Sequence, residues 1–222
     1  MRPVLTYYGG KQRMAERIVS LLPAHHHYCE PFAGGAAVFF AKGPLGPPSR
    51  YTETLNDSNE NIITLYRVLQ EPTKREHLFA KLEWTPCSLS EWRRGRVEMI
   101  LTELKDRMRW VQLECRDALA VIDKYDCPGI VFYCDPPYPD ADQGPYPGYT
   151  QADFEQLVAR LEQCQGSVVL SCYENAAVPE HWERINVRTR ATTVAGMKVN
   201  EERVEVLWRV DRSERPQLQL FR

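Results

Sequence analysis

A short polar and aromatic segment, Asp135-Pro136-Pro137-Tyr138, directly follows the apolar run Ile130 to Cys134. Such a run suits a central strand, which two consecutive prolines cannot continue. A carboxylate beside a rigid carbonyl can accept both hydrogens of an amino group on an aromatic ring, and Tyr138 can stack on that ring, as aromatic side chains do with flipped bases. The alternative is a proline-rich turn with Asp135 as its turn residue. The preceding strand and the adjoining aromatic ring favour the binding role.

A second segment, Glu30-Pro31-Phe32-Ala33-Gly34-Gly35, lies between a strand pattern ending at Cys29 and a buried helix pattern over Ala36 to Lys42. Glycines there let a ligand approach the backbone closely. In doubly wound folds, ligands bind at the carboxyl ends of strands. A tight turn that needs left-handed backbone is an equally good explanation of the glycines, so this segment alone does not decide between the two.

Asp57 follows the next predicted strand, Arg50 to Leu55, and lies 22 residues beyond Gly35. Rossmann-type sites place an acidic residue about 20 residues further on, where it binds ribose hydroxyls. The alternative is that Asp57 or Ser58 caps the helix predicted over Asn59 to Gln70. The position after the glycine segment favours the ribose role.

The rest of the chain alternates helices with apolar strands, which predicts an α/β sheet. Further helices are expected over 12–22 and 153–161, and further strands over 167–172, 184–191 and 203–210. Residues 71–112 differ, since they hold three of the five tryptophans and many arginines. They predict a small, mainly helical insert, in which Ser90 caps a helix over about 91–107. The main domain would then comprise residues 1–70 and 113–222.

Composition and charge narrow the class of protein. The 222 residues are 43% hydrophobic and 26% charged, as in a globular protein of one domain with an insert. The longest apolar stretch, 36–41, is far shorter than the ~18–20 residues of a membrane span, and no apolar leader is visible. We therefore expect a soluble, cytoplasmic protein that has no membrane partner.

Metal and disulfide chemistry are not expected either. The seven cysteines form no C-x-x-C pair, which argues against a zinc knuckle and a disulfide framework. The run His25-His26-His27 is more typical of the surface end of a helix than of a metal site.

The net charge of −2 hides an uneven distribution. Residues 113–178 carry 3 Lys/Arg and 11 Asp/Glu, whereas 1–70, 71–112 and 179–222 each carry a net charge of +2. Nucleic-acid-binding proteins usually have a basic face. Charge alone nevertheless favours an ordinary mixed surface here.

The ordered set of motifs resembles the Dam-type DNA adenine-N6 methyltransferase family, the alpha group of amino-methyltransferases. The matching pieces are Tyr7-Tyr8-Gly9-Gly10-Lys11, Glu30 to Gly35, Asn56-Asp57-Ser58-Asn59, Asp117, Asp135 to Tyr138 and the strand Val168 to Tyr173. The resemblance covers nearly the whole chain except about 71–112. It implies a Rossmann-like, S-adenosylmethionine-dependent methyltransferase sheet that is mostly parallel with an antiparallel C-terminal strand. One departure concerns the glycine motif, which reads Gly-Gly-Ala where some relatives have Gly-x-Gly. The conformation of this turn is therefore expected to differ in detail.

The resemblance also implies residue roles around an S-adenosylmethionine cofactor. Lys11 would meet the carboxylate of its methionine part, Asp57 the ribose and Asp117 the adenine. The full cofactor set would be Tyr7, Lys11, Glu30, Phe32, Ala33, Gly34, Gly35, Asp57, Asp117 and Asp135, with residues 32–35 as the floor. The catalytic set would be Asp135, Pro136, Pro137 and Tyr138.

The chemistry follows from the weak nucleophilicity of the adenine N6 atom, whose lone pair is delocalised into the ring. Hydrogen bonds from N6 to Asp135 and to the Pro136 carbonyl would localise that lone pair. Attack on the methyl group must be in line, so positioning is much of the catalysis. The base must also be flipped out of the duplex, at a cost of a few kcal/mol.

Double-stranded DNA is the partner that the resemblance implies, with residues 71–112 as the target-recognition subdomain of a monomeric, bacterial or phage-encoded, nucleoid-associated protein. The candidate DNA contacts are Arg93, Arg94, Arg96, Arg107, Arg109 and Lys198. The alternative for the arginines is a solvated helix face paired with Glu91, Glu98 and Glu103.

Two other functions remain open from the sequence. One is methylation of adenine in RNA or of cytosine N4 in DNA; Asp135 favours adenine, because cytosine-N4 relatives usually have Ser at that position. The other is an inactive nucleic-acid-binding relative, against which the intact Lys11, Asp57 and Asp135 argue.

Overall fold

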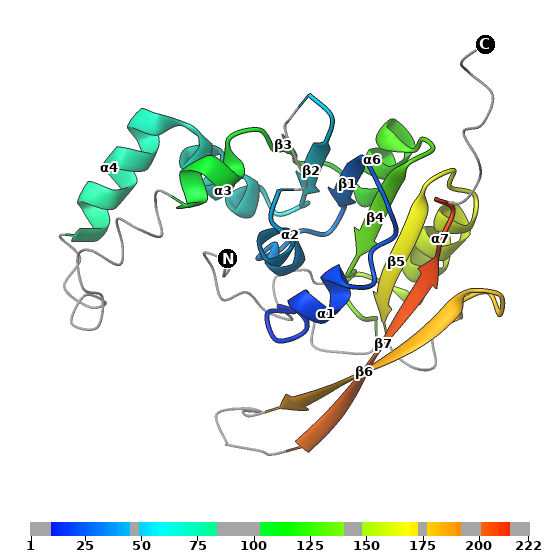
Figure 1. Cartoon of the computed structure of the whole chain (residues 1–222). Coiled ribbons are helices and arrows are strands. Elements are labelled where there is room, and N and C mark those ends of the chain that lie inside the picture. Colours follow the sequence, from blue (N-terminus) through cyan, green and yellow to red (C-terminus); the bar gives the residue numbers. More distant parts are fainter. Residues whose placement is uncertain are drawn as a thin grey trace, which may run out of the picture.

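The computed structural model describes residues 10–44, 49–83, 103–139, 148–172, 177–191 and 201–213. In these residues seven strands form one sheet in the order β3-β2-β1-β4-β5-β7-β6 (Figure 1). The strands are β1 (His27–Glu30), β2 (Thr52–Asn56), β3 (Gln112–Glu114), β4 (Ile130–Cys134), β5 (Ser167–Cys172), β6 (Glu183–Ala191) and β7 (Glu201–Val210). Strands β1 to β5 pair in parallel, and β7 runs antiparallel to β5 and β6. The predicted Rossmann-like α/β fold is therefore confirmed.

Helices cover both faces of the sheet. They are α1 (Ala15–Val19), α2 (Ala37–Lys42), α3 (Glu60–Gln70), α4 (Pro72–Glu83), α6 (Ala118–Tyr125) and α7 (Gln151–Glu162), and residues 103–108 are also helical. Alternate side chains of β4 enter opposite cores: Val131 and Tyr133 pack with α1, α2 and α3, whereas Phe132 and Cys134 pack with α6 and α7. This explains the unbroken apolar run of β4, since a parallel strand covered on both faces needs apolar side chains on each.

The strand order reverses between β1 and β4, which are neighbours. β2 and β3 lie to one side of this pair, and β5, β7 and β6 lie to the other. Ligands of open α/β sheets bind outside the carboxyl ends of the strands at such a reversal. The residues that follow Glu30 and Cys134 are therefore at the expected place for a site.

The β6–β7 pair extends past the carboxyl end of β5. The last pair between β5 and β7 joins Cys172 to Val206, whereas β6 and β7 remain paired as far as Ala191 and Glu201. Figure 1 shows this two-stranded extension projecting beyond the rest of the sheet. Among the described helices, none has both the length and the apolar character needed to cross a membrane.

Four elements differ from the sequence analysis, and one of them is β3, for which no strand was predicted. No separate helix was predicted where α4 and α6 occur. The prediction of a helix end at the histidine run is wrong, because His27 begins β1, where its Nε2 lies 2.9 Å from Thr54 Oγ1. Burial, together with His26 and His25, lowers the pKa of His27 to about 4.

The carboxyl end of the predicted insert packs into the main domain. Leu104, Met108 and Val111 are buried in the core that α1, α2 and α3 share with the sheet. Residues 84–102 lie outside the described residues, so the extent of a separate subdomain over 71–112 stays a prediction.

Candidate active site

The glycine turn after β1 is held by the carboxylate of Asp57, which directly follows β2. The Gly34 N–H donates to Asp57 Oδ2 at 2.7 Å, and the Asn59 N–H donates to Asp57 Oδ1 at 2.8 Å. On the other side of the turn, the Tyr66 hydroxyl donates to Gly34 O at 2.7 Å. Gly34 adopts a φ of 46°, which glycine adopts without steric cost. Asp57 therefore shapes the turn, and its predicted contact with a ribose stays a prediction.

The residue that caps α3 is neither Asp57 nor Ser58. Asn59 is the N-cap, and its side chain accepts the N–H of Asn61. Asp57 lies just before the cap and is only 2% exposed.

Ala36 shows how the Gly-Gly-Ala motif is accommodated. Its φ of 50° lies in the left-handed region, where a residue with a Cβ is disfavoured by roughly 1–2 kcal/mol. The Ala36 N–H donates to Ala33 O at 2.6 Å, and Ala36 O accepts the N–H of Phe40 at 3.0 Å at the start of α2. Alanine thus occupies a backbone conformation that suits glycine, and these hydrogen bonds hold it there.

Glu30 has a structural role. Its Oε1 accepts the Tyr28 hydroxyl at 2.6 Å and the Phe39 N–H of α2 at 2.7 Å, and the residue is 1% exposed. Burial raises the pKa of the Glu30 carboxyl to about 8. The carboxyl is enclosed between β1 and α2, and the predicted cofactor contact of Glu30 stays a prediction.

The segment after β4 meets Lys11. Lys11 Nζ lies 2.9 Å from Asp135 Oδ1 and donates to the Tyr138 hydroxyl at 3.3 Å. It also lies 5.1 Å from the centre of the Tyr138 ring. The structure therefore brings together three residues that were predicted for one site, and the Asp135 carboxylate is one partner of Lys11.

Two residues of this cluster were missed from the sequence. Glu205 of β7 accepts a hydrogen bond from the Tyr138 hydroxyl, and its Oε1 lies 3.1 Å from Lys11 Nζ. Ser171 of β5 donates to Glu205 Oε1 at 3.2 Å and lies 3.2 Å from the Tyr138 hydroxyl. The available signal was a lone carboxylate within the apolar stretch Val204 to Trp208.

The charges in this cluster are coupled. Burial alone lowers the pKa of Lys11, but Asp135 and Glu205 outweigh burial and raise it. Burial raises the pKa of Asp135, Lys11 opposes this shift, and Glu205 adds to it. Lys11 therefore stays charged at neutral pH, where it faces two carboxyl groups.

The carboxyl ends of β1, β2 and β3 are joined by one side chain. Asn56 Nδ2 donates to Pro31 O at 2.8 Å and to Arg116 O at 3.1 Å, and its Oδ1 accepts the Arg116 N–H at 3.0 Å. Asp117 follows and is exposed; its Oδ1 accepts the N–H groups of residues 119 and 120 at the start of α6. Asp117 therefore lies at the same edge of the sheet as the glycine turn.

The predicted DNA contacts have different outcomes. Tyr7 and four of the six predicted DNA-contact residues lie outside the described residues; these four are Arg93, Arg94, Arg96 and Lys198. The prediction for Arg107 is wrong: its guanidinium pairs with Glu53, donates to Phe39 O at 2.9 Å and is only 7% exposed.

Arg109 is exposed, and its guanidinium lies 4.9 Å from the ring centre of Trp110. Both residues precede β3, which is parallel to its neighbour, so they lie at the amino edge of the sheet, opposite Asp135. Within the described ranges, no group of three or more His, Cys, Asp or Glu side chains is arranged to hold a metal ion.

Similarity to known proteins agrees with these motifs. Residues 7–96 match the family model of the D12 class N6 adenine-specific DNA methyltransferases. The predicted resemblance is confirmed for this part of the chain. The D12 segment contains Lys11, the glycine turn and Asp57, whereas Asp135, Tyr138 and Glu205 follow it.

Two known proteins are similar in sequence to part of this chain. The type II methyltransferase M1.LlaDCHI of Lactococcus lactis subsp. cremoris is 33% identical over 72 residues, which are 32% of this chain and 23% of that protein. The DNA N-6-adenine-methyltransferase of Escherichia phage P1 is 39% identical over 70 residues, which are 31% of this chain and 8% of that protein. The matches thus span less than a quarter of either relative.

Solved structures were also similar. The rRNA methyltransferase aviRa from Streptomyces viridochromogenes has a TM-score of 0.49 at 14% identity, covering 96% of this chain and 88% of that one. A SAM-dependent methyltransferase from Agrobacterium tumefaciens has a TM-score of 0.45 at 13% identity, covering 90% and 60%.

Proposed function

We propose that this chain transfers the methyl group of S-adenosylmethionine to the N6 amino group of adenine in double-stranded DNA. The observation that carries the proposal is that the glycine turn and the Asp135–Tyr138 segment end the adjacent strands β1 and β4, where the strand order reverses. A ligand at the turn and a base at Asp135 would then be neighbours, which transfer between two bound molecules requires. The D12 match and the names of the two relatives support adenine and DNA.

The side chains at this edge suit S-adenosylmethionine. Asp57 and Asp117 offer acceptors for ribose hydroxyls and an adenine amino group, and Asp135 offers negative charge to a cation. When bound, this cofactor supplies a methyl group attached to a positively charged sulfur. We assign the floor of its site to Phe32, Ala33, Gly34 and Gly35, and one wall to Tyr7.

The residues after β4 would hold the target base. The Asp135 carboxylate and the Pro136 carbonyl accept the two hydrogens of the amino group, which localises the nitrogen lone pair. Lys11 lies 2.9 Å from the Asp135 carboxylate and opposes the rise in its pKa that burial causes. Pro137 stiffens the segment, and the Tyr138 ring stacks on the flipped base.

We assign target recognition to the part of 71–112 that holds Arg93, Arg94 and Arg96. Lys198 would contact the DNA backbone. The active species would be a monomer. Arg107 is not part of this set, because it is enclosed between β2 and α2. The salt dependence of DNA binding would count the phosphate contacts.

The test is methyl transfer to unmethylated duplex DNA, with the digested nucleosides identified by mass spectrometry. We expect N6-methyldeoxyadenosine from the wild type and none from Asp135→Ala. A matched control is Asp123→Ala, since Asp123 is an exposed residue of α6 that pairs with Arg160. This control should retain activity.

Other products would overturn the proposal. N4-methyldeoxycytidine would identify a different base, and methylation of RNA but not of DNA would identify a different polymer. DNA binding without any turnover of S-adenosylmethionine would identify a binding protein.

A further inference from the structure

We propose that Glu205 is a positioning residue, which holds Lys11 and Tyr138 in the arrangement that methyl transfer requires. This inference rests on the proposed function and adds a residue that lies outside the D12 segment. Glu205 is on β7, and the groups it contacts come from the N-terminal segment, from β5 and from the segment after β4.

The contacts converge on one atom. Glu205 Oε1 accepts the Tyr138 hydroxyl, lies 3.1 Å from Lys11 Nζ and accepts the Ser171 hydroxyl at 3.2 Å. The side chains of Glu205 and Lys11 are 21% and 11% exposed, so water screens this pair less than a surface pair. The antiparallel pairing of β5 and β7 brings Glu205 beside Ser171, because the β5–β7 register joins Ser171 to Leu207 and Cys172 to Val206.

The first consequence concerns Asp135. Lys11 Nζ is shared between Asp135 at 2.9 Å and Glu205 at 3.1 Å. A lysine ammonium has three donors and a carboxylate about four acceptor positions. Because Glu205 also pairs with the Lys11 ammonium, Asp135 retains acceptor positions for the amino group of the base. Without Glu205, the whole charge of Lys11 would act on Asp135.

The second consequence concerns Tyr138. Its hydroxyl is tied to Glu205 and Ser171, on two neighbouring strands of the sheet. A phenol that is fixed at its far end presents its ring in one orientation. A base then stacks on a ring that is already positioned, and misplacement of reacting groups by about 1 Å can cost on the order of 100-fold in rate.

The strand that carries Glu205 does not depend on this side chain. The backbone of β7 is paired along its length with β6 and, from Val206 onward, with β5. Val206 and Leu207 are fully buried. Replacement of the carboxylate should therefore leave β7 in place.

The test compares Glu205→Gln and Glu205→Ala with the matched control Glu183→Gln, which lies on β6 and pairs at the surface with Arg209. We expect kcat to fall roughly 10- to 100-fold in the Glu205 variants, with Ala below Gln, and the dissociation constant of S-adenosylmethionine to stay unchanged. The control should match the wild type. The thermal midpoint of unfolding checks that each variant is folded.

A second variant tests the Tyr138 contact. Tyr138→Phe keeps the ring but removes the hydroxyl, so we expect a loss of kcat of similar size. Since Glu205 and Tyr138 act through one hydrogen bond, the double variant Glu205→Gln/Tyr138→Phe should lose less than the product of the two single losses.

The pH profile separates positioning from folding. The carboxylate of Glu205 favours the protonated form of Asp135, so its removal should move the acidic limb of kcat/KM to lower pH. The titratable groups coupled to Asp135 or Glu205 are Lys11, Tyr138, Tyr133, Cys134, Cys172 and Glu30. A merely structural role of Glu205 would move no limb.

Three results would overturn the inference. An active wild type with Glu205→Gln as active as Glu183→Gln would leave the proposed function standing and remove Glu205 from it. Loss of activity with a lower thermal midpoint and an unmoved pH limb would show that Glu205 serves folding alone. A wild type that methylates no DNA would overturn the proposed function itself.

Discussion

Glu30 carries the pKa change with the clearest consequence for stability. Its carboxyl has a pKa of about 8 in the fold, compared with an ordinary value of 4.5, because it is buried between β1 and α2. Between these values the carboxyl is protonated in the folded protein and ionised in the unfolded chain. The stability that it contributes is therefore complete below about pH 4.5 and is lost as the pH rises through about 8.

Glu30→Gln should remove this part of the pH dependence. Glutamine can still accept the Tyr28 hydroxyl and the Phe39 N–H, and it has no charge to bury. We expect the free energy of unfolding in urea to fall less between pH 6 and pH 9 than in the wild type. The exposed Glu155→Gln on α7 is the control. Equal slopes in the Glu30 and Glu155 variants would contradict the assignment.

Local motifs identified part of the site, and contacts between distant strands supplied the rest. Lys11, Asp135 and Tyr138 were predicted because each belongs to a short motif. Glu205 lies 67 residues from Tyr138 and reaches it through the β5–β7 register, which no local pattern encodes. Arg107 shows the reverse failure: the buried Leu104 lies three residues before it, and that spacing places its side chain on the buried face of the helical residues 103–108.

At the scale of elements, Asp57 joins the glycine turn to the start of α3. Asp57→Asn leaves one oxygen for two N–H groups and directs an NH₂ group at the second donor. We expect a loss of about 1–3 kcal/mol in the free energy of unfolding, as for a buried donor left without its acceptor, and weaker binding of S-adenosylmethionine. Urea unfolding and calorimetric titration measure the two effects.

Asp117→Asn is a matched control for this prediction. Asp117 uses only Oδ1 for both N–H groups that it caps, and asparagine is an equally good N-cap. Its stability should stay near that of the wild type. If Asp57 acted on a ribose alone, Asp57→Asn would weaken cofactor binding and leave the unfolding curve unchanged.

Arg107 attaches the helical residues 103–108 to β2 and α2. Its partners are Glu53, Phe39 O and the Phe39 ring, whose centre lies 3.3 Å from the guanidinium carbon. Arg107→Ala should cost about 1–3 kcal/mol in the free energy of unfolding, because it leaves Phe39 O without its donor. The loss stays below that of a buried charge left unpaired, since Lys42 still lies 2.7 Å from Glu53. Urea unfolding measures this loss, and the exposed Arg109→Ala should show nearly none. A stable Arg107→Ala protein with weaker DNA binding would restore the original prediction of a DNA contact.

Elements that are apolar on both faces were the most predictable from the sequence. The bounds of β4 agree with its apolar run, as do those of β5, because both are covered by helices on each side. α4 has few apolar residues, and α6 has only eight residues, so neither gave a helical pattern long enough to recognise. Strand order was predictable only through the family resemblance, since alternation of helices and strands does not specify which strands are neighbours.

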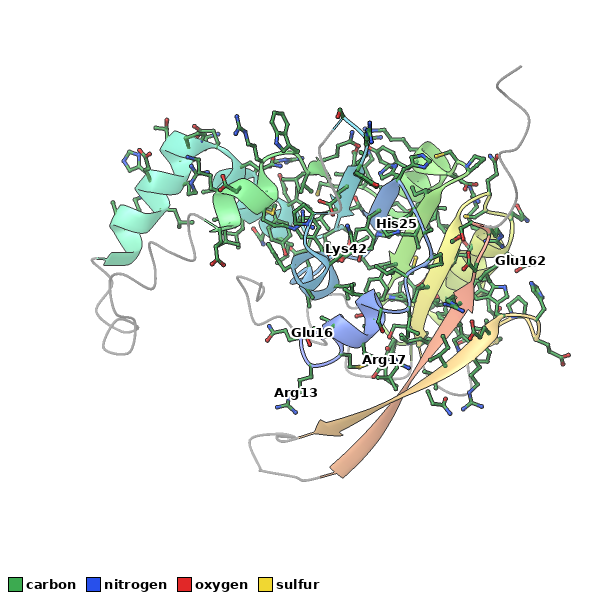
Figure 2. The ribbon with its side chains drawn as sticks, viewed as in Figure 1. Arg13, Glu16, Arg17, His25, Lys42 and Glu162 are labelled. Carbon is green, nitrogen blue, oxygen red and sulfur yellow. The ribbon has the colours of Figure 1, made fainter. Side chains whose placement is uncertain are left out.

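At the scale of the whole molecule, the proposed function requires DNA to approach the carboxyl edge of the sheet, where Asp135 lies. Arg13 and Arg17 are exposed at α1, which begins a few residues after Lys11. Figure 2 shows Arg13 projecting from this region away from the sheet. Arg109, in contrast, lies at the amino edge. Arg13 and Arg17 are therefore exposed arginines close in the chain to Lys11, from where they can contact phosphates beside the proposed site.

We therefore expect the double variant Arg13→Ala/Arg17→Ala to bind duplex DNA more weakly. The slope of log K against the logarithm of the salt concentration should also become shallower by about 1–2, since each phosphate contact contributes about 0.9 to that slope. Fluorescence anisotropy with a labelled duplex at several salt concentrations measures both quantities. Arg109→Ala is the matched control, and its slope should equal that of the wild type. A reduced slope in Arg109→Ala alone would mean that DNA contacts the amino edge of the sheet. That result would contradict an approach of the proposed DNA substrate to the carboxyl edge.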